Sequence, residues 1–380
     1  MLKILFLSPH WYTATMSFAM ESILSLAQRG HFVDIVASSL ASPPINFCHS
    51  HIRVFSFKDS PTVWRYSYLN FFKEVLNKVS HCKYDVVICL SEYSLIIGWA
   101  TNLIFKKPYV YYNDELHFGD ESRRILGKVY GYCVKKLERI ANRRVLFTVT
   151  QDQQRGQILA KLNHIAFDTL RYLPNSRSGS ARIRNSFYLH DRFGFSHDTK
   201  IILWLGGVRP GDGAIELARS TEKWSTDYRM VFNFPTRPLT DYMKSILAYH
   251  GFGRTFVSTK PVPYNDVDSL STSASIGLGL YGDKGPNARC MGASSGKINL
   301  FLQAGIPCIV SNFEGLRWVE ANGAGLCIDH TSEILSSILR IFSDYEKYRQ
   351  QSVDTFNKYL NFDKAFESIV EELEEILRIK

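Results

Sequence analysis

Residues 292–311 read Gly-Ala-Ser-Ser-Gly-Lys-Ile-Asn-Leu-Phe-Leu-Gln-Ala-Gly-Ile-Pro-Cys-Ile-Val-Ser, and this stretch decides the fold class. Its first half predicts a helix over residues 296–304, which ends at Gly305. Pro307 then opens a short, continuously apolar run to residue 311. Such a run, directly after a helix, is typical of a strand buried on both faces of a parallel sheet. The stretch therefore predicts one helix–strand unit of an α/β fold.

The same alternation of apolar strand and helix extends through the rest of the chain. The other predicted strands cover residues 4–8, 32–37, 85–90, 108–112, 145–150, 201–205, 229–234, 255–258 and 275–280. The other predicted helices cover residues 17–29, 94–105, 214–220, 239–250, 265–272 and 316–322. Continuous apolar strands separated by helices indicate parallel sheets that are covered on both faces.

The alternation is interrupted once, at residues 172–176 (Tyr-Leu-Pro-Asn-Ser) and the Ser-, Arg- and Gly-rich stretch that follows. We therefore expect two Rossmann-like domains, residues 1–176 and residues 177–359, which face each other across a central cleft. The last segment, residues 360–380, carries an apolar stripe on an otherwise acidic helix. We expect this helix to return to the first domain.

Composition and charge narrow the class of protein. The 380 residues are 45% apolar and 21% charged, as in a globular protein of two domains. Neither the N-terminal apolar run nor residues 93–105 has the features of a secretory signal or the length of a membrane span. The seven scattered cysteines favour buried thiols in a reducing compartment, so we expect a cytoplasmic protein. Residues 1–175 carry a net charge of +8 and the remainder +1, which suggests anionic partners for the first half.

Two glycine-containing segments in the second half are candidate phosphate sites. Gly206 and Gly207 follow a predicted strand, and Arg209 could add charge-assisted hydrogen bonds to a phosphate. The alternative is a simple glycine-rich turn with a surface arginine. No nucleic-acid-binding module is recognisable in the chain, so we expect no nucleic-acid partner.

The second candidate is the start of the helix in the opening stretch. Small residues, a serine cap and a helix N-terminus form an anion site there, with Lys297 in the first turn able to reach a diphosphate. It is not a P-loop, because Ile298 stands where that motif requires Ser or Thr. The alternative is an ordinary capped helix with an exposed lysine. The residues involved are Gly292, Ser294, Ser295, Gly296 and Lys297.

These segments, in this order, resemble the retaining glycosyltransferases of family 4 (group 1 type), which have the two-Rossmann B-type fold. Residues 297–311 are similar to that family's donor-binding helix and strand, and residues 206–209 to its phosphate loop. Residues 173–176 resemble its interdomain segment, residues 261–265 its segment near the nucleobase, and residues 315–325 its penultimate helix and turn. The resemblance implies a metal-independent sugar transfer from a nucleotide-sugar, UDP- or GDP-linked, with no further cofactor and no metal site.

The chain departs from that family at two positions. Where the family often has two glutamates separated by seven residues, this sequence has Gly292 and Leu300. Leu300 cannot hold ribose hydroxyls, so Asn299 or the loop of residues 283–287 is the expected substitute, with Tyr281 beside it in the donor site. A chain that has lost catalytic activity is an alternative.

In the first half, the resemblance places sugar- and acceptor-facing residues after two strands. Asn113, Asp114, Glu115 and His117 correspond to the place where the family has a histidine facing the transferred sugar, and Asp114 or Glu115 could act as a base. His10 lies in a turn that would shape the acceptor site. The alternative is that these residues cap the following helix or lie on the surface.

Residues 123–144 form a basic amphipathic helix, which can lie on an anionic membrane. The aromatic and basic stretch of residues 64–78 would contribute to the same surface. The alternative is a solvated helix face over a packed aromatic core.

The sequence therefore favours a retaining glycosyltransferase that acts on a glycan or lipid-linked acceptor in polysaccharide or glycolipid biosynthesis, with peripheral membrane contact. A nucleotide-sugar epimerase of the same fold and a non-catalytic sugar-nucleotide- or glycan-binding protein are the alternatives.

Overall fold

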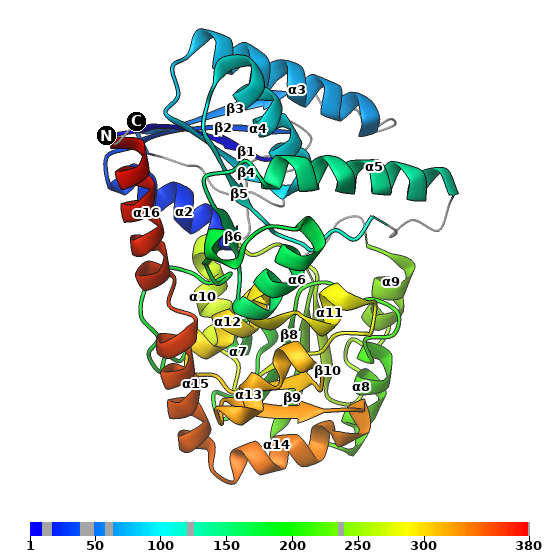
Figure 1. Cartoon of the computed structure of the whole chain (residues 1–380). Helices are drawn as coiled ribbons and strands as arrows, with labels where there is room; N and C mark the ends of the chain where they lie inside the picture. Colours follow the sequence, from blue (N-terminus) through cyan, green and yellow to red (C-terminus); the bar gives the residue numbers. More distant parts are fainter. Residues whose placement is uncertain (10–16, 39–48, 58–63, 120–124, 235–238, 379–380) are drawn as a thin grey trace. The chain divides into compact units, whose positions relative to one another are not determined.

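The computed structural model describes residues 1–378 apart from residues 10–16, 39–48, 58–63, 120–124 and 235–238 (Figure 1). The chain divides into two compact units. Unit 1 comprises Met1–Ser178 and Phe362–Lys380, and unit 2 comprises Gly179–Asn361. Each unit is built around one parallel sheet.

The sheet of unit 1 has seven strands in the order β3-β2-β1-β4-β5-β6-β7. All of its strand pairs are parallel. The strands are β1 (Lys3–Leu7), β2 (Phe32–Ser38), β3 (Ile52–Phe57), β4 (Val86–Leu90), β5 (Tyr109–Tyr112), β6 (Thr148–Thr150) and β7 (Leu170–Tyr172). The helices are α2 (Ser17–Gln28), α3 (Trp64–His81), α4 (Ser91–Phe105), α5 (Ile125–Asn142), α6 (Gln153–Asn163) and α16 (Phe362–Arg378), with a 3-10 turn at Phe167–Thr169.

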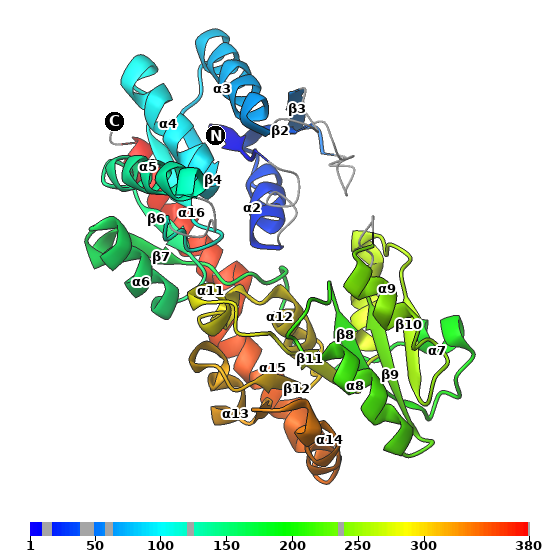
Figure 2. The same ribbon diagram turned by 90° about the vertical axis from the view of Figure 1, so that its right-hand side faces the viewer.

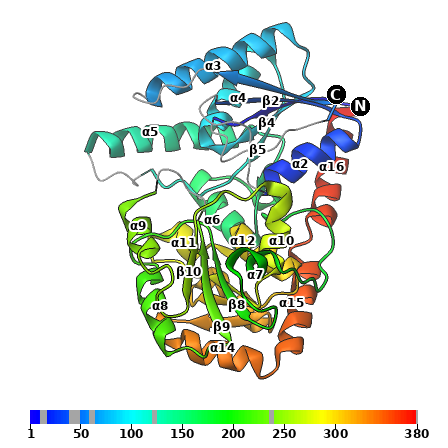
Figure 3. The ribbon, with the colours of Figure 1, turned by 180° about the vertical axis from the view of Figure 1, so that it is seen from behind.

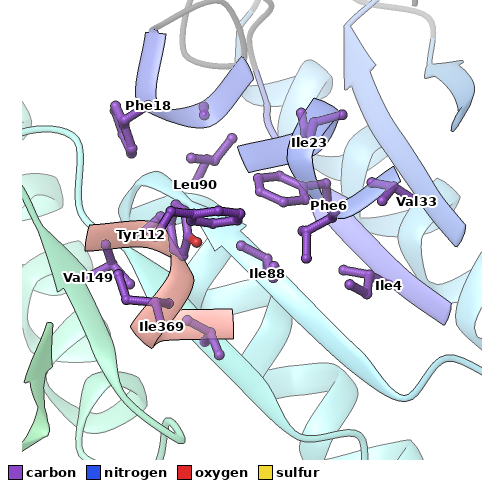
Figure 4. Packing of buried hydrophobic residues seen from close by; sticks show 14 of the residues in the cluster. Ile4, Phe6, Phe18, Ile23, Val33, Ile88, Leu90, Tyr112, Val149 and Ile369 are labelled. Carbon is purple, nitrogen blue, oxygen red and sulfur yellow. The ribbon is translucent and has the colours of Figure 1, made fainter. Parts of the chain in front are cut away.

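Helices cover both faces of this sheet, as the continuous apolar strands predict. Alternate residues of β1 point to opposite faces, so Ile4 and Phe6 join one core and Leu5 and Leu7 the other. The first core is closed by α2 and α16, and the second by α3, α4, α5 and α6. Figure 4 shows the first core, in which Tyr112 lies beside Phe6 of β1 and Ile369 of α16 belongs to the same cluster.

The C-terminal helix α16 belongs to unit 1, which confirms the prediction that it returns to the first domain. Phe362, Phe366, Ile369, Val370 and Leu373 are all buried against the sheet. Each such side chain contributes about 1.5–3 kcal/mol by leaving water. Acidic residues of the helix form partly exposed ion pairs with Arg29, which follows α2, and with Arg171 on β7. Glu374 lies 3.0 Å from the buried His31. Because exposed ion pairs contribute little, the apolar stripe is the main attachment.

The sheet of unit 2 has six parallel strands in the order β10-β9-β8-β11-β12-β13 (Figures 2 and 3). The strands are β8 (Lys200–Leu205), β9 (Tyr228–Asn233), β10 (Thr255–Ser258), β11 (Ile276–Gly279), β12 (Cys308–Ser311) and β13 (Gly325–Ile328). The helices are α7 (Tyr188–Phe193), α8 (Ala214–Ser220), α9 (Asp241–Leu247), α10 (Val267–Thr272), α11 (Pro286–Arg289), α12 (Gly296–Gln303), α13 (Trp318–Ala321), α14 (Ile334–Phe342) and α15 (Tyr345–Tyr359). The 3-10 turns are Thr221–Lys223, Tyr264–Asp266, Gly292–Ser294, Glu314–Leu316 and Thr331–Glu333.

Unit 2 is also covered on both faces. Helices α8, α9 and α14 pack on one face of the sheet, and α7, α10, α12, α13 and α15 on the other. The strand order, counted within the unit, is 3-2-1-4-5-6, the order of the doubly wound Rossmann fold. In such sheets ligands bind at the carboxyl ends of the strands. We therefore expect a ligand site in the loops that follow β8 and β11.

Three strands are not predicted by the sequence pattern, namely β3, β7 and β13, and each lies at the edge of its sheet. Of these, β3 is buried only at its two ends, Ile52 and Phe57, so it lacks the continuous apolar run of a strand that is covered on both faces. Of the described helices, none is both long enough and apolar enough to cross a bilayer.

Candidate functional site

Two loops meet at the carboxyl edge of the unit 2 sheet. Residues 206–213 follow β8, and residues 280–290 follow β11. The loops approach so closely that a Cβ on Gly282 would lie 2.6 Å from the Gly211 carbonyl oxygen. Gly206, Gly211 and Gly213 all have positive φ angles, which glycine adopts without the strain that other residues incur. Gly206, which the sequence analysis names, and two further glycines thus shape a tight loop at the carboxyl edge of the sheet.

Asp212 organises the first of these loops. Its two carboxylate oxygens accept hydrogen bonds from the backbone N–H groups of Arg209 and Ala214, the second at 3.2 Å. Tyr242 lies beside the same carboxylate, with its hydroxyl 3.4 Å from Oδ1. Arg209 itself is exposed, so its guanidinium can reach a ligand in solvent.

Lys297 lies in the first turn of α12 and holds its ammonium at this edge. The Nζ atom is 4.3 Å from the centre of the Tyr281 ring and 5.1 Å from that of Trp204, both cation–π distances. Burial lowers the pKa of Lys297 to about 8, and the nearby charge of Asp212 opposes that shift. The lysine is therefore a partly desolvated cation that is largely protonated at pH 7.

The serines before α12 do not have the roles that the sequence predicts. Ser295 is the N-cap residue, but its side chain makes no capping hydrogen bond. Its hydroxyl instead lies 2.6 Å from the Tyr281 hydroxyl, and the Tyr281 backbone N–H donates to Ser311 at 2.9 Å. The N–H groups of Ser294 and Ser295 donate to carbonyls of their own 3-10 turn, at 2.9 and 3.3 Å. The predicted serine cap is therefore wrong, while the predicted contact of this segment with a diphosphate stays a prediction, with the first turn of α12 as the source of helix N–H groups.

Asn299, the expected substitute for a ribose-binding glutamate, supports the backbone instead. Its side chain is fully buried and donates to the Ala293 carbonyl at 2.8 Å. Gly292 lies in the same turn with a φ of +41°, and Leu300 joins the core. In the neighbouring loop, Asp283 is bound by both ends of the Arg289 guanidinium fork, at 2.6 and 3.0 Å.

The predicted sugar- and acceptor-facing residues of unit 1 lie at the carboxyl edge of its own sheet. Asp114 and Glu115 follow β5, and Glu92 follows the neighbouring strand β4. Burial, together with the charges of Glu92 and Glu115, raises the pKa of Asp114 to about 8. Burial also raises the pKa of Glu92, to about 6. Neighbouring carboxyl groups therefore titrate near neutral pH, a property common at functional sites.

Asn113 and His117 are held by internal contacts. Asn113 is fully buried, and its amide nitrogen donates to the Tyr111 hydroxyl at 2.9 Å and to the Glu115 carbonyl at 2.7 Å. His117 has its Nδ1 atom 3.5 Å from Glu138. His10, the other acceptor-side prediction, lies outside the residues that the structure describes.

Glu138 is a buried carboxylate that ties α5 to the sheet and to α6. Burial alone would raise its pKa, but the hydrogen bond from His117 and the charge and hydrogen bonds of Lys135 and Asn163 lower it instead. Lys135 donates to it at 3.0 Å and is itself buried. Lys135 is therefore not part of the solvent-facing basic surface that the sequence predicts for residues 123–144.

The rest of α5 does expose an amphipathic surface. Ile125 and Leu126 are 81% and 82% exposed, and Val129, Tyr132 and Leu137 are also exposed. The exposed cations of this segment are Lys128, Lys136, Arg143 and Arg144, while Arg123 and Arg124 lie outside the described residues. The alternative, a solvated helix face over an aromatic core, does not account for the exposed apolar side chains of this helix.

Four residues at the two edges escape the sequence analysis: Glu92, Trp204, Asp212 and Ser311. Trp204 and Ser311 lie on predicted strands, for which the sequence pattern indicates burial in the core and no contact with a ligand. Asp212 lies in the glycine loop. Its short separation in sequence from Arg209 and Ala214, from whose backbone N–H groups it accepts hydrogen bonds, is the feature that could have indicated its role. Among the described residues, no cluster of three His, Cys, Asp or Glu side chains could hold a metal ion.

The fold is shared with several solved structures over nearly the whole chain. Sucrose-phosphate synthase from Thermosynechococcus elongatus superposes with a TM-score of 0.78 over all of both chains, at 13% identity. Anabaena HepE, in complex with UDP and glucose, gives a TM-score of 0.74 over 98% of this chain and all of that one, also at 13% identity. A putative UDP-N-acetylglucosamine 2-epimerase from Listeria monocytogenes gives 0.64 over all of this chain and 97% of that one, at 12% identity.

No protein-family model and no curated protein sequence matches the chain. Identities of 12–14% show the fold alone. The chain therefore has the B-type fold of two Rossmann-like domains, as predicted from the sequence.

Proposed function

We propose that this chain is a glycosyltransferase that takes its sugar from a nucleoside-diphosphate sugar. The observation that carries the proposal is the Lys297 ammonium, held at the carboxyl edge of the unit 2 sheet beside the glycine loop and the first turn of α12. A cation, a glycine-rich turn and a helix N-terminus together suit a diphosphate. The fold adds support, because HepE, which shares it, was solved with UDP and glucose.

In the proposed reaction, an acceptor hydroxyl oxygen bonds to the anomeric carbon while the bond from that carbon to the diphosphate oxygen breaks. The electron pair leaves with the diphosphate, whose charge grows. Lys297 and Arg209 would stabilise that charge, the kind of electrostatic contribution that usually dominates catalysis. We propose a UDP- or GDP-linked donor and a transfer that needs no metal ion.

The stereochemistry that we propose is retention. A retaining transfer needs no protein base, because a departing phosphate oxygen can take the acceptor proton. An inverting transfer needs a base, and Asp114 or Glu115 would then supply it. The raised pKa of Asp114, about 8, keeps most of its carboxyl protonated at pH 7, which suits a hydrogen-bond donor better than a base. NMR of the first product formed distinguishes the two outcomes by its anomeric configuration.

We further propose that the acceptor is a glycan or a lipid-linked glycan and that α5 docks on a cytoplasmic membrane surface. The exposed apolar side chains of Ile125, Leu126 and Val129 suit insertion among lipid headgroups. The exposed Lys128 and Lys136 suit anionic lipids. Such a contact fits a role in polysaccharide or glycolipid biosynthesis.

Vesicle sedimentation tests the docking. We expect the full chain to sediment with vesicles of phosphatidylglycerol and phosphatidylcholine at low salt, and less at high salt. The double variant Ile125→Ser/Leu126→Ser should lose most of this binding. Leu339→Ser, at an exposed leucine on α14, is the matched control and should bind normally. Equal binding by all three proteins would contradict the docking proposal.

An epimerase is the second candidate, favoured by the carboxyl groups that titrate near neutral pH in unit 1 and by the fold shared with the Listeria protein. Incubation of the donor without acceptor separates the two functions. Epimerised sugar supports the second candidate, and slow hydrolysis to free sugar and nucleoside diphosphate supports the first.

A ligand screen tests the main proposal. We expect UDP or GDP, and one of their sugars, to raise the melting temperature of the full chain, whereas the matching nucleoside has little effect. The preferred donor is then offered with cell-envelope extracts, and release of the nucleoside diphosphate is measured. A screen in which no nucleoside diphosphate binds would contradict the proposal.

A further inference from the structure

The carboxyl edge of the unit 1 sheet brings together three polar residues from three neighbouring strands. Ser91 follows β4, Asn113 follows β5 and Gln151 follows β6. The register pairs Leu90 with Tyr112 and Tyr112 with Val149, so Ser91 and Asn113 directly follow paired residues, and Gln151 lies two residues after Val149 at the same edge. The Gln151 amide nitrogen donates to the Asn113 backbone carbonyl at 2.6 Å, which holds the Gln151 side chain against the Asn113 backbone.

Each of the three carries a buried side-chain oxygen that has no hydrogen-bond partner among the described residues. These atoms are Ser91 Oγ, Asn113 Oδ1 and Gln151 Oε1, and all three residues are at least nine-tenths buried. The amide nitrogens of Asn113 and Gln151 are already engaged, so the two amide oxygens remain as acceptors. An unmet buried polar atom costs about 1–3 kcal/mol, which a ligand that donates hydrogen bonds would recover.

The charged groups at this edge are mostly acidic. Glu92, Asp114 and Glu115 lie there, and the charge of Glu115 helps to raise the pKa of both Glu92 and Asp114. The two nearby cations are engaged: Lys135 donates to Glu138 at 3.0 Å, and Arg155 donates to the Asp114 backbone carbonyl at 3.1 Å. The +8 charge of the first half therefore does not make this edge basic.

We propose that this edge is a subsite for an uncharged sugar, whose hydroxyl groups donate to Ser91, Asn113 and Gln151, and that Glu92 excludes anionic sugars from it. The proposal rests on the proposed glycosyltransferase function and specifies the acceptor that unit 1 takes. Hydroxyl groups supply the donors that the three oxygens lack. A carboxylate or phosphate on the sugar would be repelled by the acidic side chains, because no free cation among the described residues of this edge could pair with it. Any anionic part of the acceptor then binds elsewhere, such as at the exposed lysines of α5.

Saturation-transfer NMR on the full chain with UDP present tests the subsite. The probes are the methyl glycosides of glucose, galactose, mannose and N-acetylglucosamine, together with methyl glucuronide. We expect at least one uncharged glycoside to bind, and methyl glucuronide to bind at least tenfold more weakly than the best of them.

Variants assign the binding to this edge. Gln151→Leu should weaken the best glycoside at least fivefold, whereas Gln157→Leu, at an exposed position of α6, should not. Glu92→Gln should narrow the difference between glucoside and glucuronide at least fivefold without weakening the uncharged sugar.

The outcomes separate this inference from the proposed function, because UDP affinity is measured in the same samples. If UDP binds but no glycoside does, or if the glucuronide binds best, the subsite proposal is wrong and the donor site stands. If UDP itself does not bind, the proposed function fails first. Unchanged sugar binding in Gln151→Leu would also overturn the subsite.

Discussion

The carboxyl edges of the two sheets have the same architecture and opposite chemistry. In unit 2, glycines with positive φ and a lysine at a helix N-terminus lie where we propose that a phosphate binds. In unit 1, the corresponding edge carries carboxyl groups, two of which titrate near neutral pH, and amide oxygens without partners among the described residues. The parallel sheet fixes where a ligand binds, and the loop residues decide what it is.

The net charge of each half of the chain does not predict the charge at the carboxyl edge of its sheet. The first half of the chain holds almost all of the excess positive charge, yet its ligand edge is acidic. The second half is nearly neutral, yet it holds the cation that we assign to the diphosphate. Charge acts at the range of a Debye length or less, so the local arrangement outweighs the sum.

The largest effect that we predict concerns the acidic edge. Asp114 has a raised pKa in the folded protein, so its contribution to stability is present at low pH and is lost as the pH rises from about 4 through about 8. Asp114→Asn removes this loss. In differential scanning calorimetry, we expect the melting temperature of the variant minus that of the wild type to be several degrees larger at pH 9 than at pH 5.

The exposed Asp168 in the same unit provides the control for that prediction. Asp168→Asn should give the same difference from wild type at both pH values. If the difference in melting temperature between Asp114→Asn and wild type is also the same at both pH values, the pKa of Asp114 is not raised. The contrast between the carboxyl groups of unit 1 and the lysine of unit 2 would then lose its main support.

The next effect concerns the basic edge and has the opposite direction. Lys297 has a pKa lowered to about 8, so its charge is present below that pH and lost above it. UDP binding by calorimetry should therefore weaken about tenfold from pH 7 to pH 9. Lys297→Arg should flatten this dependence, because arginine stays charged throughout. An affinity that is constant over this range in the wild type would rule out Lys297 as the titrating contact.

The smallest effect concerns Arg209. Its guanidinium is exposed, so it gains less from contact with a ligand than a partly buried lysine does. Arg209→Ala should weaken UDP binding by about twofold to fivefold and slightly reduce the salt dependence of that binding. Arg219→Ala, on the neighbouring helix α8, is the control. A loss greater than that for Lys297→Ala would reverse the assigned order of the two cations.

Much of the fold is predictable from the sequence because the buried strands are. The central strands of both sheets are mostly apolar, and the predicted strands end within three residues of the observed ends. Of the four edge strands, β10 is predicted from the sequence, whereas β3, β7 and β13 are not. The pairing of the edge strand β3 with β2 shows only in the structure. There Arg53 of β3 donates hydrogen bonds to both carboxylate oxygens of the buried Asp34 of β2, at 2.7 and 2.8 Å.

The candidate sites divide in the same way. Lys297 and the glycine loop are visible in the sequence because their spacing is local. Glu92 is not, because its relation to Asp114 depends on two strands lying side by side. Ser295 and Asn299 were assigned to the ligand, but Tyr281 and the Ala293 carbonyl take their hydrogen bonds, and a sequence does not show such competition.

The central claim is that the Lys297 ammonium binds the diphosphate of a donor, and calorimetry of wild type and Lys297→Ala with UDP and with uridine tests it most directly. We predict that the variant loses about tenfold to one hundredfold in UDP affinity, that uridine binding changes little, and that Lys244→Ala behaves like the wild type. The melting temperature of the ligand-free variant should be nearly unchanged. Equal losses for UDP and uridine would contradict the claim.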